Sequence, residues 1–102
     1  MVFIYTVCEN IAQAKELGRK IIKARVAACV NIWPIESIYF WEGKLTEGQE
    51  AVLLIKTNEQ KFADIESFLK KYHTYSTPII ASINADRLNR EYKEWMSTRI
   101  TK

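Results

Sequence analysis

The feature that most constrains the fold is a long strand-forming stretch that ends in a two-residue turn. Residues 27–41 are rich in β-branched and aromatic side chains, which favour extended structure. Pro34 lies inside this stretch and predicts an interruption, because proline cannot donate to a sheet ladder. Residues 42–43 are Glu-Gly and predict a hairpin turn, followed by a return strand over residues 44–56. We expect a kink or bulge at residues 47–49, opposite the break.

The predicted hairpin is longer than the expected diameter of the domain that carries it. The fifteen residues of its first strand would extend about 50 Å at ~3.3 Å per residue, whereas a domain of about 100 residues is roughly 35 Å across. The tip carries Tyr39, Phe40 and Trp41, and Trp33 precedes the break. An exposed aromatic arm indicates a partner. The alternative is that these aromatic side chains fold back onto the chain's own core.

The segments on either side of the hairpin predict two strand–helix units. Residues 2–7 form an apolar strand, and Asn10 caps a helix that runs to about residue 24. A second helix is expected, with Thr57 or Asn58 as its cap and a buried stripe that runs from Phe62 to Tyr72. A strand is expected over residues 79–84, followed by a short helix capped by Asn89. The fold class is therefore α+β, a ferredoxin-like βαββαβ sandwich with a long central hairpin and an extra C-terminal helix. Residues 1–102 are expected to form a single domain.

Several strands of this predicted sheet are apolar on both faces. Two helices can cover only one face, and the last helix is too short to cover the other. A neighbouring copy of the chain is the simplest cover, so we expect self-association.

Charge and cysteine content set the expected environment. Fifteen Lys and Arg against twelve Asp and Glu leave a net charge of +3, too small to indicate nucleic-acid binding. No apolar run approaches the ~20 residues of a membrane span, and the N-terminus reads as a strand and not as a leader. Cys8 and Cys29 lie in apolar segments. We therefore expect a cytoplasmic protein with reduced thiols.

Two functional readings of the fold are disfavoured by the residues themselves. RNA-recognition domains share the topology, but residues 51–55 lack their basic, glycine and aromatic signature. Gly43 and Gly48 have the glycine spacing of a phosphate-binding loop, but Gln49 and Glu50 stand where Lys and Ser/Thr are required. A single histidine with no partner motif offers no catalytic triad, so we predict that the chain is not an enzyme.

Four segments together resemble one known family. They are Arg-Val-Ala-Ala-Cys-Val-Asn-Ile at residues 25–32, Ser-Ile-Tyr-Phe-Trp-Glu-Gly-Lys at 37–44, His-Thr-Tyr-Ser-Thr-Pro at 73–78 and Glu-Tyr-Lys-Glu-Trp at 91–95. In this order and spacing they resemble the CutA divalent-cation tolerance family over essentially the whole chain. The resemblance implies a ferredoxin-like subunit in a tight homotrimer, similar in architecture to the PII signalling proteins. It also implies a link to copper and other divalent-metal tolerance, without enzymatic activity.

In such a trimer the long hairpins lie across neighbouring subunits. The residues expected at the trimer interface are those of the hairpin: Trp33, Tyr39, Phe40, Trp41, Glu42 and Lys44.

His73, Cys29 and Glu50 are the candidate ligands for Cu(II) or another divalent cation. His73 is the only histidine, and neutral imidazole is the commonest ligand for Cu(II) and Zn(II). A firm site needs three or four ligands, so a neighbouring subunit would have to contribute. The alternatives are a structural histidine bonded to backbone and a cysteine that packs as a small hydrophobic residue.

A second hypothesis is a PII-like signalling or anchoring trimer that binds a small anion or a protein in clefts between subunits. Arg25, Lys56 and Tyr75 could line such a cleft. The chain departs from the family pattern at Thr74, where proline is frequent, and at Ile79, where many members have glutamate. The missing glutamate weakens a three-ligand metal site in this chain.

Overall fold

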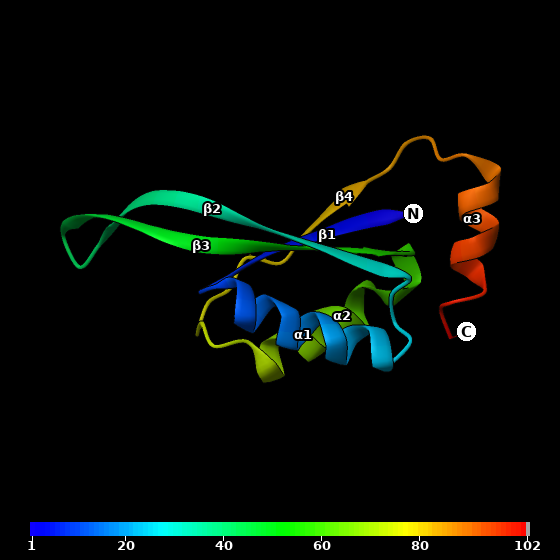
Figure 1. The fold of residues 1–102 in the computed structure, drawn as a ribbon, viewed down its shortest axis with the longest axis horizontal. Helices are drawn as coiled ribbons and strands as arrows, with labels where there is room; N and C mark the ends of the chain where they lie inside the picture. Colours follow the sequence, from blue (N-terminus) through cyan, green and yellow to red (C-terminus); the bar gives the residue numbers. More distant parts are fainter. Residues whose placement is uncertain (102) are drawn as a thin grey trace.

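A four-stranded antiparallel sheet forms the centre of the computed structural model, which describes residues 1–101 (Figure 1). In chain order the elements are β1 (Val2–Cys8), α1 (Ile11–Lys23), β2 (Cys29–Trp41), β3 (Lys44–Thr57), a 3₁₀ turn (Glu59–Lys61), α2 (Phe62–Tyr72), β4 (Ala81–Asn84) and α3 (Arg90–Ser97). The strand order is β2-β3-β1-β4. This confirms the predicted ferredoxin-like α+β fold with its C-terminal helix. Within residues 1–101, none of the helices has the length and hydropathy that a membrane crossing requires.

The helix α1 begins where the sequence predicts. The side chain of Asn10 accepts a hydrogen bond from the backbone N–H of Gln13 at 2.8 Å, which satisfies one of the free donors of the first turn. Gly18 then lets the helix approach β2 closely, because a Cβ atom there would lie 3.0 Å from Cγ2 of Val30. The start of α1 and its distance from the sheet thus both follow from single residues.

The sheet has one face covered by helices and one face that is not. Along β1, Ile4 and Cys8 are buried against a core that includes Leu17 of α1 and Leu69 of α2. The alternate residues of β1 point to the opposite side of the sheet, which we call the open face. By strand register the open face comprises Phe3, Tyr5, Val7, Cys29, Asn31, Trp33, Ile35, Glu50, Val52, Leu54, Lys56, Ala81 and Ile83.

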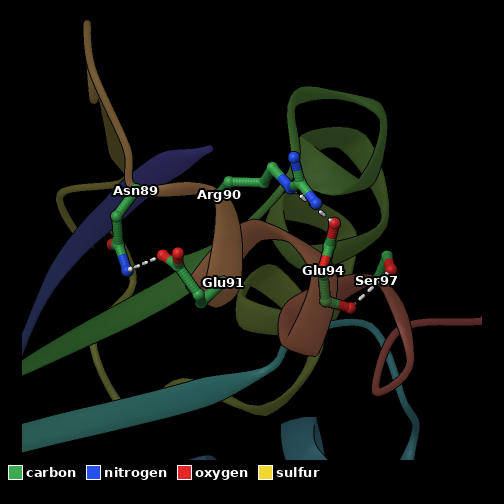
Figure 2. Close-up of polar contacts among 5 residues, drawn as sticks. All are labelled: Asn89, Arg90, Glu91, Glu94 and Ser97. Carbon is green, nitrogen blue, oxygen red and sulfur yellow. Dashed lines mark hydrogen bonds and ion pairs between the residues drawn. The ribbon is translucent and has the colours of Figure 1, made fainter.

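The helix α3 lies at one end of this sheet, near the N-terminus (Figure 1). The Nζ atom of Lys56 on the open face lies 5.9 Å from the ring centre of Tyr92 in α3. Local polar contacts support the helix, including an ion pair between Arg90 and Glu94 at 3.0 Å (Figure 2). Asn89 occupies the N-cap position as predicted, but its side chain bonds to Glu91 and not to backbone.

The hairpin of β2 and β3 projects well beyond the helices (Figure 1), and the molecule measures 47 × 26 × 21 Å. The predicted turn is confirmed, and Glu42 and Gly43 have φ angles of 51° and 77°, which match the type I′ turn of two-residue hairpins.

Two details of the predicted hairpin are wrong. Pro34 does not interrupt β2, since it pairs in register with Ala51. No bulge occurs at residues 47–49, because Gly48 pairs one-to-one with Ser37. Pro34 fits into the strand because of the strand order. β2 is an edge strand, where a residue without an N–H donor is tolerated. The predicted strand over 79–84 is also shorter, beginning at Ala81.

Candidate functional site

The loop after α2 is fastened to the sheet by His73. Its Nε2 atom lies 2.9 Å from the carbonyl oxygen of Val7 at the end of β1. Its Nδ1 atom accepts a hydrogen bond from the backbone N–H of Tyr75 at 3.0 Å. Because Nδ1 is an acceptor, the proton of the neutral ring belongs on Nε2, which donates to Val7. Both ring nitrogens therefore have partners inside the chain.

Tyr75 connects the same loop to β3. Its hydroxyl donates to Oε2 of Glu50 at 2.5 Å, the short distance expected when the acceptor is charged. Burial raises the pKa of Tyr75, and the hydrogen bond and charge of Glu50 raise it further. The phenol therefore remains a proton donor to the carboxylate throughout the physiological range.

Cys8 and Glu9 complete a polar cluster at this end of β1. We call Cys8, Glu9, Glu50, His73 and Tyr75 the loop cluster. Cys8 is fully buried, and burial, together with the charges of Glu50 and Glu9, raises its pKa to about 11. Burial lowers the pKa of His73, while the bond to Val7 and the charge of Glu9 oppose that shift. The cluster thus holds a neutral thiol and an imidazole biased towards its neutral form.

Cys29, the third predicted ligand, lies at the other end of the sheet. It pairs with Lys56 in the β2–β3 register, whereas Glu50 pairs with Ile35. Six positions along β3 separate the two pairs, about 20 Å at ~3.3 Å per residue. Within residues 1–101, no group of three or more His, Cys, Asp and Glu side chains is placed to hold a metal. One chain alone does not bring the three predicted ligands together.

The residues of the anion hypothesis are also divided between the two ends. Arg25 lies in the turn between α1 and β2, where it has a positive φ of 60° and its carbonyl accepts from the N–H of Thr101. Lys56 lies at the same end, since its carbonyl accepts from Ala28. Tyr75 belongs to the loop cluster. A cleft with all three would need more than one subunit.

All six predicted interface residues lie along the hairpin and are exposed. Phe40 is 74% exposed and Trp41 63%. The sequence reasoning missed Ile38 and Leu45, which are 66% and 63% exposed. Strand alternation could have found them, because Ile38 shares a face with Phe40 and Leu45 pairs directly with Phe40. The arm is therefore apolar on both faces.

The sequence reasoning also missed Glu9 and the bond between Tyr75 and Glu50. Glu9 follows a strand that was predicted only for its apolar residues. The Tyr75–Glu50 bond spans 25 residues, and nothing in the local sequence of either residue points to the other.

The order of these features matches one protein family. The sequence model of one protein family, the CutA1 divalent ion tolerance protein family, matches residues 2–99. This chain belongs to that family. CutA1 proteins are not a family of enzymes, which confirms the prediction that this chain is not an enzyme. The resemblance to the CutA family seen in the sequence is confirmed as well.

Individual relatives support the assignment over nearly the full length. The divalent-cation tolerance protein CutA of Thermococcus kodakarensis is 35% identical, over 94% of this chain and 92% of its own. The crystal structure of CutA1 from Pyrococcus horikoshii superposes with a TM-score of 0.96 at 29% identity and covers both chains fully. A structure from Archaeoglobus fulgidus, described as a periplasmic divalent cation tolerance protein CutA, gives 0.93 at 33% identity, covering 99% of this chain and all of its own.

Proposed function

We propose that this chain acts in divalent-cation tolerance as a homotrimer that binds copper or another divalent cation between its subunits. The observation that carries the proposal is the exposed apolar hairpin above an uncovered sheet face. Monomeric proteins rarely expose contiguous apolar surface of this kind. The tolerance role is supported by membership of the CutA1 family.

The hairpin and the open face give the trimer its contact surface. Tyr39 and Trp41 share the side of the arm that continues into the open face, and Trp33 lies where the arm leaves the sheet. Packing these side chains against a second copy removes them from water. Each Å² of apolar area buried in this way stabilises the assembly by about 25 cal/mol. Glu42 and Lys44 at the tip provide charged groups for the rim of that contact.

The positions of the candidate ligands also favour a site shared by subunits. Glu50 and Cys29 lie on the open face about 20 Å apart, so a second subunit must supply what one chain lacks. The Cys29 thiol is half-buried and free, and thiolate suits copper(I). His73 already has two backbone partners, so it can bind a metal only by exchanging one of them. We therefore expect weak, exchangeable metal binding.

The test combines assembly mass with copper titration. Light scattering after size exclusion at micromolar concentration should give three times the 11.9 kDa chain mass. Copper binding should fall in His73→Ala, Cys29→Ser and Glu50→Gln, and should persist in the control Cys8→Ala, which removes a fully buried thiol. A monomer at micromolar concentration would overturn the assembly. If every variant binds copper as the wild type does, these three residues are not copper ligands.

The proposed compartment is the cytoplasm. Cys8 and Cys29 are both free, and reducing compartments preserve free thiols. Fractionation of the native host with an antibody against the chain would test this, and recovery only in a periplasmic or extracellular fraction would contradict it.

A further inference from the structure

A groove lies between α1 and the edge strand β2, on the helix-covered side of the sheet. Its volume is about 320 Å³, at the lower end of the ~300–1,000 Å³ typical of small-molecule sites. The floor is formed by Gly18 and Ile22 of α1 with Val30 and Ile32 of β2. It is separate from the open face and from the loop cluster.

The floor of the groove is apolar and incompletely covered. Ile22 belongs to the apolar side of an amphipathic helix, yet it is 38% exposed, while Ile21 beside it is fully buried. Val30 and Ile32 are half-buried although they pack against the core. The close approach at Gly18 brings helix and strand together, leaving these side chains as a shallow trough.

The rim of the groove is entirely basic. Lys15, Arg19 and Lys23 recur every four residues along α1 and line the groove together. Over residues 1–101 none of the three makes an ion pair, whereas Lys61, Lys70 and Arg90 do. No acidic residue lines the groove. Lys23 follows Lys15 by eight positions along the helix, so the rim is about 12 Å long at ~1.5 Å per residue.

We propose that this groove binds a small anionic amphiphile, a carboxylate with an unbranched aliphatic tail. The tail lies on the trough of Ile22, Val30 and Ile32, and the carboxylate pairs with the rim cations. Arg19 lies at the middle of the rim and offers the planar donor geometry that matches a carboxylate. An inorganic anion would leave the apolar floor in water, and an uncharged alkane would leave the cations unpaired. Only a ligand with both parts uses the whole groove.

The test compares ligands that differ in one part. Octanoate and 1-octanol share a tail, and acetate has the head alone. Titration of the assembled protein, followed by amide NMR shifts, should give saturable octanoate binding with shifts at Gly18, Ile22 and Val30. We expect 1-octanol and acetate to bind at least about tenfold more weakly, since a tenfold change corresponds to about 1.4 kcal/mol.

Two double variants distinguish the effect of the rim cations on octanoate binding from the effect of the protein's net charge. Arg19→Glu with Lys23→Glu should weaken octanoate binding about tenfold or more. Arg87→Glu with Lys93→Glu makes the same change in net charge at exposed positions away from the groove and should leave binding within about twofold. Ile22→Asn should weaken octanoate binding without altering the rim.

Three outcomes would overturn the proposal. Equal binding of 1-octanol and octanoate would show that the rim has no role. Equal effects of the two double variants would reduce the attraction to net charge. An absence of saturable octanoate binding to the assembled protein would show that the groove is not a site.

Discussion

At the scale of single residues, His73 is the clearest case of a side chain with a defined task. Its neutral ring joins the end of β1 to the loop after α2 through Val7 and Tyr75. Protonation of Nδ1 would replace an acceptor with a second donor facing the N–H of Tyr75, so the charged form cannot keep both bonds.

This bonding predicts a specific pH dependence of stability. Burial holds the pKa of folded His73 below the ordinary 6.5, so below pH 6.5 the unfolded chain binds the proton more readily. The stability contributed by neutral His73 is complete above pH 6.5, falls as the pH drops towards the lower folded pKa, and is constant below it. Urea unfolding between pH 5 and 8 should show this loss.

The variant His73→Ala isolates that contribution. Loss of its two hydrogen bonds should lower the free energy of unfolding at pH 7.5 by about 1–2 kcal/mol. The part of the pH dependence that belongs to His73 should disappear with it. An unchanged slope between pH 5 and 6.5 in the variant would assign the effect to groups other than His73.

Tyr75 supports a second prediction at this scale. Tyr75→Phe removes the hydroxyl that donates to Glu50 and should destabilise the fold by about 1 kcal/mol. Burial and Glu50 raise the pKa of the phenol, so one tyrosine that ionises above the ordinary range in an ultraviolet absorbance titration should be missing from the variant. Tyr5→Phe is the matched control, because the Tyr5 hydroxyl has no hydrogen-bond partner among residues 1–101. A titration identical to that of the wild type would contradict the assignment.

How well a residue could be read from sequence depends on how far away its partner lies. The Asn10 cap was predictable, because its partner Gln13 is three residues away. His73 stood out as the only histidine, but its partner Val7 is 66 residues distant and is a backbone atom that no motif marks. The long-range half of the loop cluster therefore required the fold.

At the scale of elements, the hairpin shows the same division. The turn at Glu42 and Gly43 was predictable because it rests on local backbone preferences. The behaviour of Pro34 was not, since it depends on β2 being an edge strand, and the edge is set by the order of all four strands. The apolar pattern fixed which segments are strands, and tertiary pairing decided how regular they became.

The two glycines of the hairpin provide a paired prediction. Gly43→Ala should destabilise the chain by about 1–2 kcal/mol, because its φ of 77° is unfavourable for a residue with a Cβ atom. Gly48→Ala has no positive φ and no atom within 4 Å of a new Cβ, so it should be neutral or stabilise by up to about 1 kcal/mol. Thermal unfolding of both variants is the measurement. A greater loss in Gly48→Ala would mean that a neighbouring subunit occupies the space beside it.

At the scale of the whole molecule, the two sides of the sheet have different tasks. The helix-covered side holds the core and the α1–β2 groove, and the open face continues into a projecting arm with exposed apolar side chains. A single chain therefore has a complete fold, but it leaves apolar surface exposed to water. From sequence, the excess length and aromatic tip already indicated assembly, because both are properties of composition and chain geometry.

The pair of Phe40 and Leu45 allows the assembly to be tested without disturbing the fold. They are cross-strand partners near the tip and are exposed in the single chain, so replacing both with serine should leave the subunit folded while removing apolar contact area. We expect the trimer of the double variant to dissociate at concentrations at least about tenfold higher than the wild type, measured by sedimentation equilibrium. Ile22→Ser, an exposed apolar residue far from the arm, should leave the assembly unchanged. If the two variants dissociate alike, or if neither differs from the wild type, the arm does not hold the subunits together.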